Sequence, residues 1–93
     1  VQMMGGLAYM TGGRHGPLRA GASVNDVMGG MFGAIGILAA LNQRTITGDG
    51  QYLQSALFEN VAFLMAQHML EGYATGQPVK PMPDRIRAWA LYD

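Results

Sequence analysis

The chain has 93 residues, of which 49% are hydrophobic and only 13% are charged, and its formal net charge is zero. Soluble domains carry about 25% charged residues, and a chain this short buries only about 60–65% of its unfolded surface. The balanced charge, with no basic cluster, excludes an electrostatic nucleic-acid site, and the absence of cysteine excludes disulfides and thiolate metal sites.

So much apolar surface predicts that these residues belong to a longer polypeptide or dock on another subunit. We therefore expect that the isolated chain is not a stable monomer. The start at Val1 and the end at "AWALYD", without a cap or a charged tail, favour an internal segment. No charged start or cleavage pattern indicates a signal peptide. A chain without cysteine is compatible with the cytoplasm, where we expect the protein.

The first 23 residues are rich in glycine. Residues 1–4 are interpreted as the tail of a helix that Gly5 ends, and residues 9–21 as a loop. The next element is a helix over residues 26–43. Gly30, Gly33 and Gly36 each weaken this helix by up to ~1 kcal/mol relative to alanine, so they predict close packing against a neighbouring backbone.

The same helix raises the question of a membrane, because no residue in 27–43 is charged. Its strictly apolar part, 27–41, is shorter than the ~20 residues that span a bilayer. A helix buried inside a large protein is the better interpretation, and we expect no membrane contact.

After a turn at "TGDG", residues 51–57 read as a short strand. A second helix is predicted over residues 58–74, where Val61, Leu64, Met65, His68 and Met69 recur at helical spacing. The prolines of "ATGQPVKPMP" then interrupt the pattern. We divide the chain into residues 1–77, part of a large domain, and residues 78–93, an incomplete linker toward a smaller one.

Asp26 is the single acidic residue at the head of the apolar helix. The run Ser23, Val24, Asn25, Asp26 has the spacing of a capping box, in which Ser23 caps the helix and Asp26 reaches back. Alternatively, Asn25 is the cap and Asp26 the first helical residue. In both cases the positive end of the helix dipole stabilises the carboxylate, and a structural cap is the simpler reading of these residues.

A wider pattern adds a chemical role. The order of "GGL", "TG", "PLRAG", "ND", "GG", "GILAAL", "TGDGQ" and "SALFE" over residues 2–76 resembles the family III CoA-transferases of the CaiB/BaiF type. That family includes formyl-CoA transferase, carnitine CoA-transferases and the related α-methylacyl-CoA racemases. The resemblance implies an α/β fold with a Rossmann-like large domain, of which this chain holds mostly two helices joined by a turn and a short strand.

The resemblance also implies that Asp26 is the catalytic nucleophile. Its carboxylate would attack an acyl-CoA thioester to give a mixed anhydride, and the CoA thiolate would return to form an aspartyl-CoA thioester. An acceptor carboxylate would then reverse the sequence. The implied partners are an acyl-CoA, a carboxylic acid and a second subunit in an intertwined homodimer. CoA enters as a substrate, with no tightly bound cofactor and no metal.

Other polar residues are weaker candidates. Arg14 and Arg19 flank the loop before Asp26 and could meet a CoA phosphate or a substrate carboxylate. His15 is interpreted as a solvated loop residue, His68 as a satisfied packing residue and Glu59 as a helix-start residue. Gln54 stands where the family commonly has an aspartate, and Asp49 stands where it commonly has a basic residue. These two departures leave the subfamily open.

Two rival functions stay open. On the same fold, an α-methylacyl-CoA racemase would use Asp26 as an acid or base toward the α-carbon, together with a histidine upstream of this chain. The second rival function is that of a non-catalytic helical interaction segment.

Overall fold

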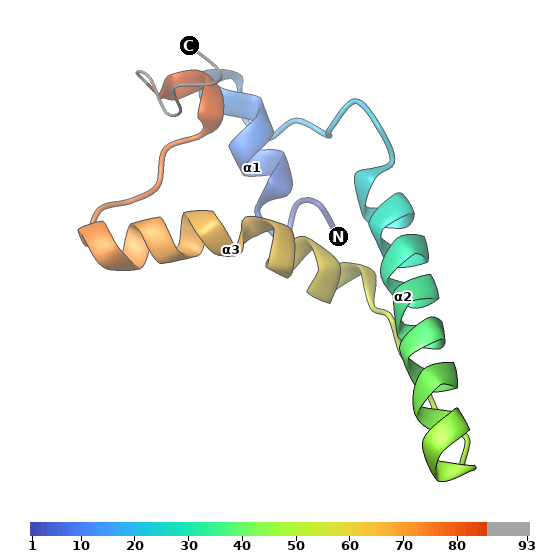
Figure 1. Ribbon diagram of the computed structural model, residues 1–93. Helices are drawn as coiled ribbons and strands as arrows, with labels where there is room; N and C mark the ends of the chain where they lie inside the picture. Colours follow the sequence, from blue (N-terminus) through green and yellow to red (C-terminus); the bar gives the residue numbers. More distant parts are fainter. Residues whose placement is uncertain (86–93) are drawn as a thin grey trace.

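The computed structural model describes residues 1–85, and the regular secondary structure in that range is entirely helical. The elements are α1 (Leu7–Gly12), the 3-10 turn η1 (Gly13–His15), α2 (Val24–Thr47), α3 (Leu57–Thr75) and the 3-10 turn η2 (Met82–Asp84). Figure 1 shows α2 extending away from the unit that α1 and α3 form.

Helix α2 confirms the helix predicted over residues 26–43 and extends it at both ends. It ends at Gly48, which has φ 81° and donates its N–H to the carbonyl of Arg44 at 2.8 Å. Glycine takes this left-handed conformation without steric cost, so Gly48 stops the helix. Arg44 lies in the last turn, where its charge suits the helix dipole.

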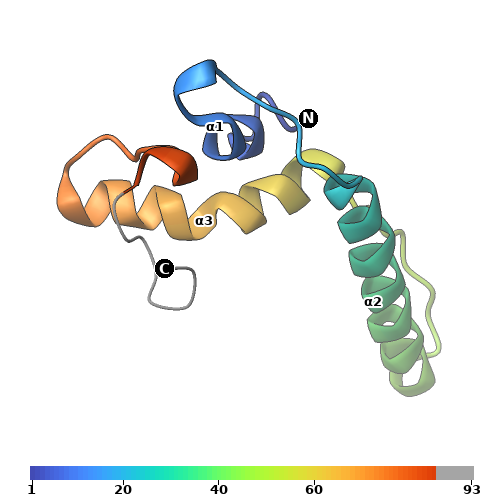
Figure 2. The same ribbon diagram turned by 90° about the horizontal axis from the view of Figure 1, so that it is seen from above.

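The strand predicted over residues 51–57 is wrong. Residues 51–56 are extended but have no strand to pair with, and no strand is present anywhere in residues 1–85. The segment instead runs back alongside α2, as Figure 2 shows. The Ser55 hydroxyl donates a hydrogen bond to the carbonyl of Gly29 at 3.1 Å, so the segment is attached to the helix by a side chain.

The small residues of α2 explain how this segment comes so close. A Cβ atom on Gly36 would lie 2.9 Å from Leu53 Cδ1, and one on Gly33 would lie 3.8 Å from Ser55 Cβ. The close packing predicted for these glycines is confirmed at Gly36, although the neighbour there is a side chain and not a backbone. Gly33 makes an ordinary van der Waals contact. Gly30 has open space instead, while a Cβ atom on its neighbour Gly29 would collide with the side chain of Leu57.

Helix α3 confirms the second predicted helix, and its buried face forms the small core with α1. Val61 is fully buried, and Met65 is almost so. Ala8 and Met10 of α1 contribute the other buried apolar side chains. Figure 2 shows α1 lying over α3. Gly5 permits this contact, because a Cβ atom there would overlap the side chain of Val61.

The predictions for the N-terminal region are wrong except for residues 16–21, which form a loop as expected. Helix α1 and η1 occupy much of residues 9–21, which were expected to form a loop, and residues 1–4 form turns rather than a helix tail. The glycines bracket the short helix instead of breaking it: Gly6 (φ 89°) precedes α1, and Gly13 (φ 62°) follows it. Left-handed residues of this kind favour glycine.

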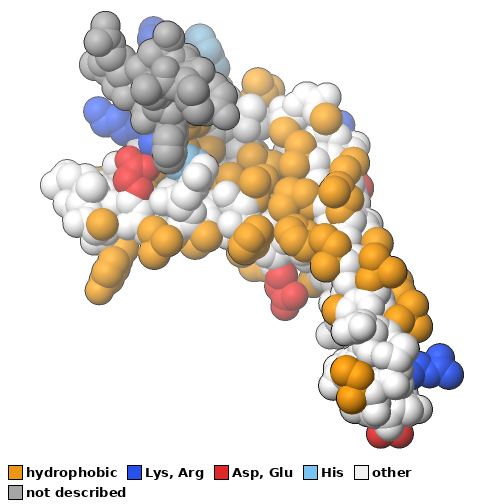
Figure 3. Space-filling model, in the orientation of Figure 1, with side chains coloured by type: hydrophobic (Ala, Val, Ile, Leu, Met, Phe, Trp, Pro, Cys, Tyr) orange, Lys and Arg blue, Asp and Glu red, His pale blue; other side chains and the backbone are white. Residues whose placement is uncertain are grey.

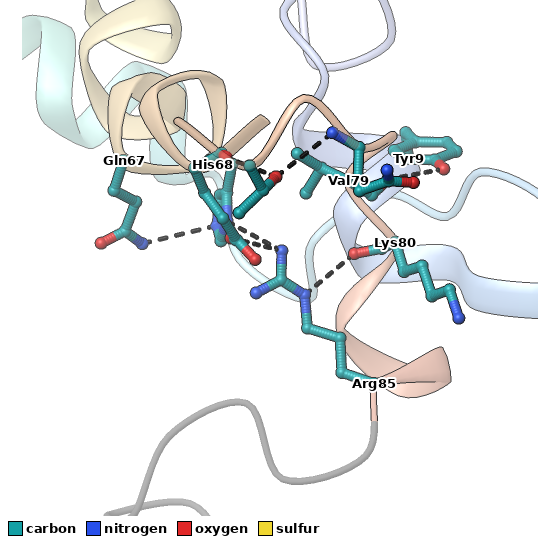
Figure 4. Close-up of polar contacts among 9 residues, drawn as sticks. Tyr9, Gln67, His68, Val79, Lys80 and Arg85 are labelled. Carbon is teal, nitrogen blue, oxygen red and sulfur yellow. Dashed lines mark hydrogen bonds and ion pairs between the residues drawn. The ribbon is translucent and has the colours of Figure 1, made fainter. Parts of the chain in front are cut away.

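Beyond α3, the chain folds back onto the core. Figure 4 shows Arg85 reaching the side chain of His68. The Arg85 guanidinium donates to Glu71 Oε2 at 2.9 Å and lies 3.4 Å from His68 Nδ1. The Tyr9 hydroxyl donates to the carbonyl of Val79 at 3.0 Å. Residues 78–85 of the predicted linker thus contact α1 and α3, and the rest of that linker, 86–93, lies outside the described residues.

This arrangement predicts a pH dependence of stability. Burial, and then the charge of Arg85, lower the pKa of His68 below its usual 6.5, against an opposing effect of Glu71. The unfolded chain therefore binds the proton more readily, and stability that is fully present above pH 6.5 should fall as the pH drops below that value. Urea unfolding of the native protein that carries this chain, between pH 5 and 7.5, would measure the loss.

The control for this prediction is the second histidine. We expect His68→Gln to flatten the pH dependence below pH 6.5, whereas His15→Gln, on the exposed turn η1, keeps it. Equal effects of the two substitutions would contradict the assignment to His68.

Helix α2 was expected to be buried, and within this chain it is not. Only 11% of the most apolar stretch of 18 residues in α2 is buried. Large apolar side chains are exposed along it, including Val27, Met31, Ile35 and Leu38, and Figure 3 shows hydrophobic atoms along its surface. By length and composition α2 could cross a membrane, a property that it shares with core helices of large soluble proteins.

Candidate functional site

Asp26 lies in the first turn of α2, and it is exposed. The turn begins after Ser23, whose carbonyl accepts the N–H of Val27 at 3.0 Å. The first N–H groups of a helix have no partner inside it, and those of Asn25 and Asp26 donate no hydrogen bond within the described part of the chain. Two free donors thus lie beside the carboxylate.

The capping box expected here does not form. Ser23 does occupy the cap position, which removes the alternative of Asn25 as the cap, but its side chain makes no capping hydrogen bond. Its hydroxyl instead accepts a hydrogen bond from Arg19 Nη2 at 3.2 Å. Asp26 makes no side-chain hydrogen bond or ion pair to any residue in 1–85. Its carboxylate is therefore available to a ligand.

A pocket of about 350 Å³ opens beside this carboxylate. It gathers residues from the N-terminal turn, α1, the loop before α2 and the start of both long helices: Val1, Gln2, Met3, Ala8, Arg19, Asn25, Asp26 and Leu57. The Gln2 side chain accepts the N–H of Ala20 at 2.9 Å, which fixes the loop that carries Arg19. The fold thus brings together two residues that the sequence singled out, Asp26 and Arg19.

Asn25 is the residue of this pocket that sequence reasoning missed. Its side chain is 5% exposed, and its Oδ1 atom is enclosed without a hydrogen-bond partner in residues 1–85. A buried acceptor without a donor costs about 1–3 kcal/mol. The signal in the sequence was a second polar residue next to Asp26 at the head of an apolar helix, but its only use there was as an alternative cap.

The remaining candidates lie elsewhere. Arg14 and His15 are exposed on η1, and neither lines the pocket. Glu59 is exposed in the first turn of α3 and lines a different pocket, of about 260 Å³, with Phe32, Ser55 and Phe63. His68 is buried next to Arg85 and Glu71. In residues 1–85 no three histidine or acidic side chains come together as metal ligands.

The comparison with protein families decides the class of this chain. The model of "CoA-transferase family III" matches residues 1–93. The chain belongs to CoA-transferase family III. The resemblance found in the sequence is thereby confirmed.

Curated members of CoA-transferase family III are similar to this chain over most of its length. It is 38% identical to a succinyl-CoA–L-malate CoA-transferase beta subunit of Chloroflexus aurantiacus, over 83% of the chain and 19% of that protein. It is 32% identical to a succinyl-CoA:mesaconate CoA-transferase of Haloarcula hispanica, over 83% of the chain and 20% of the relative. It is 46% identical to a formyl-CoA:oxalate CoA-transferase of Rhodopseudomonas palustris, over 66% of the chain and 15% of that protein.

The chain spans about a fifth of the length of the curated family III relatives that it matches. No solved structure is significantly similar to it.

Proposed function

We propose that this chain forms part of the active site of an enzyme that transfers coenzyme A from an acyl-CoA thioester to a carboxylic acid, with Asp26 as the nucleophile. The family membership and the names of the relatives support the reaction class. The observation that carries the role of Asp26 is its geometry. It is an exposed carboxylate without an ion-pair partner in the described residues, on the wall of a pocket that it shares with Arg19.

The first half of the proposed reaction transfers CoA to the enzyme. An oxygen of the Asp26 carboxylate attacks the thioester carbonyl, the C–S bond breaks, and CoA leaves as a thiolate, so that a mixed anhydride of Asp26 and the donor acid remains. The thiolate then attacks the Asp26 carbonyl of the anhydride, which releases the donor acid and leaves an aspartyl-CoA thioester. Covalent catalysis of this kind divides one difficult exchange into easier steps.

The second half reverses these steps with the acceptor acid. Its carboxylate attacks the aspartyl-CoA thioester, the thiolate leaves and returns to the acceptor carbonyl, and Asp26 is regenerated as a carboxylate. Every step passes through a tetrahedral oxyanion. The free N–H groups of Asn25 and Asp26 at the start of α2 are donors of the kind that stabilises such an oxyanion.

We further propose the context in which these residues work. The helices of residues 1–77 belong to an α/β domain of Rossmann-like type, with residues 78–93 leading toward a smaller domain, and the enzyme is a cytoplasmic homodimer without a tightly bound cofactor. The exposed apolar side chains of α2 support burial against other parts of such an assembly.

Mass spectrometry of the native protein that carries this chain tests the proposal. After mixing with an acyl-CoA and no acceptor, we expect a CoA adduct on the peptide that contains Asp26. Asp26→Ala should lose this adduct. Asp49→Asn, a change in the exposed turn after α2, is the matched control and should keep it.

The other outcomes identify the rival functions. Exchange of the α-proton without an adduct, over a set of acyl-CoAs, would indicate a racemase. Neither an adduct nor exchange would return Asp26 to a structural role at the start of α2.

A further inference from the structure

Gln2, in the N-terminal turn, lines the pocket beside Asp26, and its side-chain amide has a fixed orientation and an unused donor. We propose that Gln2 is a catalytic residue of the transfer reaction. Its Nε2 donates a hydrogen bond to the oxyanion that forms on the thioester carbonyl when the Asp26 carboxylate attacks. This inference rests on the proposed function, because it assumes that the attack occurs from Asp26.

The orientation of the Gln2 amide is set by the loop before α2. The main-chain N–H of Ala20 donates to Gln2 Oε1 at 2.9 Å. An N–H group needs an acceptor, and the acceptor of a side-chain amide is its oxygen. The oxygen therefore faces Ala20, and the NH₂ group of Gln2 points away from this contact.

Gln2 is also held in place by its main chain. Its carbonyl accepts the N–H of Ala8, in α1, at 3.1 Å. The loop that binds its side chain is itself joined to α1, because the N–H of Leu18 donates to the carbonyl of Ala8 at 2.9 Å. A donor that is fixed before the substrate arrives needs no reorganisation during the reaction, which is what makes oxyanion donors effective.

The NH₂ group of Gln2 is free to meet a ligand. Nε2 makes no hydrogen bond within residues 1–85. It is not enclosed either, since Asn25 Oδ1 is the single buried side-chain polar atom without a partner in that range. Asp26 accepts no hydrogen bond from it, so the donor is not occupied by the nucleophile before the reaction. An interaction that is made only in the transition state raises the rate of the chemical step.

Gln2 complements the main-chain donors at the start of α2. The free N–H groups of Asn25 and Asp26 belong to the same turn as the nucleophile, so they suit the oxyanion that forms on the Asp26 carbonyl when the thiolate attacks the anhydride. The oxyanion on the thioester carbonyl belongs to a molecule that enters the pocket. Gln2 supplies a neutral donor to it from the N-terminal turn, a separate part of the pocket lining.

Two substitutions separate the donor from the loop anchor. Gln2→Glu keeps an acceptor for the N–H of Ala20 but its carboxylate has no donor, whereas Gln2→Met removes both. In the native protein that carries this chain, we would measure the single-turnover rate of CoA adduct formation on Asp26 with an acyl-CoA. We expect both variants to be slower on the order of a hundredfold, the effect of removing one oxyanion donor.

A CoA thioether, which has no carbonyl group and does not react, reports on binding alone. We expect its Kd to be the same in both Gln2 variants as in the native protein. A displaced loop or an added negative charge in the pocket would weaken its binding, but the loss of a donor to the oxyanion would not. Gln43→Glu and Gln43→Met are matched controls that should keep the native rate, because Gln43 Oε1 likewise accepts a hydrogen bond, from Gln51 Nε2 at 2.9 Å, near the end of α2.

A native rate in either Gln2 variant would overturn the inference, and in Gln2→Glu alone it would make Gln2 only an anchor of the loop. A fall in rate that matches the fall in thioether affinity would overturn it as well. If Gln2→Met does not fold, Gln2→Glu decides by the same two measurements. The native protein separates the two proposals: an adduct with native rates in the variants overturns this inference alone, whereas no adduct overturns the proposed function and this inference together.

Discussion

Asp26→Asn is expected to lower the rate of CoA transfer on the order of 10³-fold or more, the range seen when a nucleophile or its activating partner is removed from an enzyme. Asparagine preserves the size of the side chain but offers no carboxylate to attack a thioester. The free N–H groups at the start of α2 are main-chain donors, so they stay in place. The measurement is kcat/KM for transfer, with the CoA adduct on the same peptide as a second readout.

Asp49→Asn is the matched control, and we expect its rate to stay within a few-fold of the native value. Asp26→Ala completes the set, because hydrolysis of an asparagine amide can regenerate aspartate. If both Asp26 variants keep more than a tenth of the native rate, the carboxylate is not the nucleophile.

Gly12→Ala is expected to destabilise the protein by about 1–3 kcal/mol, the usual cost of overpacking. An added Cβ atom would lie 2.7 Å from the backbone nitrogen of Leu18 and 2.9 Å from two backbone atoms of Pro17. These atoms cannot rotate away as a side chain does. The N–H of Leu18 also donates to the carbonyl of Ala8 at 2.9 Å, so relief of the contact would disturb that hydrogen bond.

Gly30→Ala provides the opposite case. Nothing lies within 4 Å of the position of its added Cβ atom, and alanine favours a helix over glycine by up to ~1 kcal/mol. We therefore expect a gain in the free energy of unfolding, measured for both variants by urea denaturation. If Gly12→Ala lowered the free energy of unfolding no more than Gly30→Ala does, the tight packing of Gly12 against Pro17 and Leu18 would be contradicted.

The sequence was sufficient for the two long helices because each carries a sustained signal. Helix α3 has its buried residues at helical spacing, and α2 is a long apolar run that ends at a glycine turn. The short extended segment after Gly48 could not be assigned in the same way. A strand needs a hydrogen-bonded neighbour that local sequence does not reveal, and here the neighbour is the glycine-containing face of α2.

The prediction of a loop at the N-terminal region failed for the opposite reason, because the local sequence signal there was misleading. Repeated glycines are typical of loops, yet Gly6 and Gly13 serve as the two ends of α1. At the candidate site, the chemistry of Asp26 came from the family pattern. Its place in a pocket with Arg19 and Asn25 depends on Gln2 and Leu57, which are distant in sequence, so only the structure could reveal it.

The way residues 48–56 return along α2 has a consequence for the order of folding. The contacts of this hairpin, such as that between Ser55 and Gly29, join residues 26 apart. Docking of α1 on the far side of the molecule joins Tyr9 to Val79, 70 residues apart. Because the entropy of closing a loop grows with its length, the contact between Ser55 and Gly29 can form before Tyr9 meets residue 79. The contacts that hold Gln2 and Arg19 close still shorter loops, of 18 residues to Ala20 and of 4 residues to Ser23. Both sides of the pocket beside Asp26 can therefore assemble before the chain beyond α3 folds back onto α1.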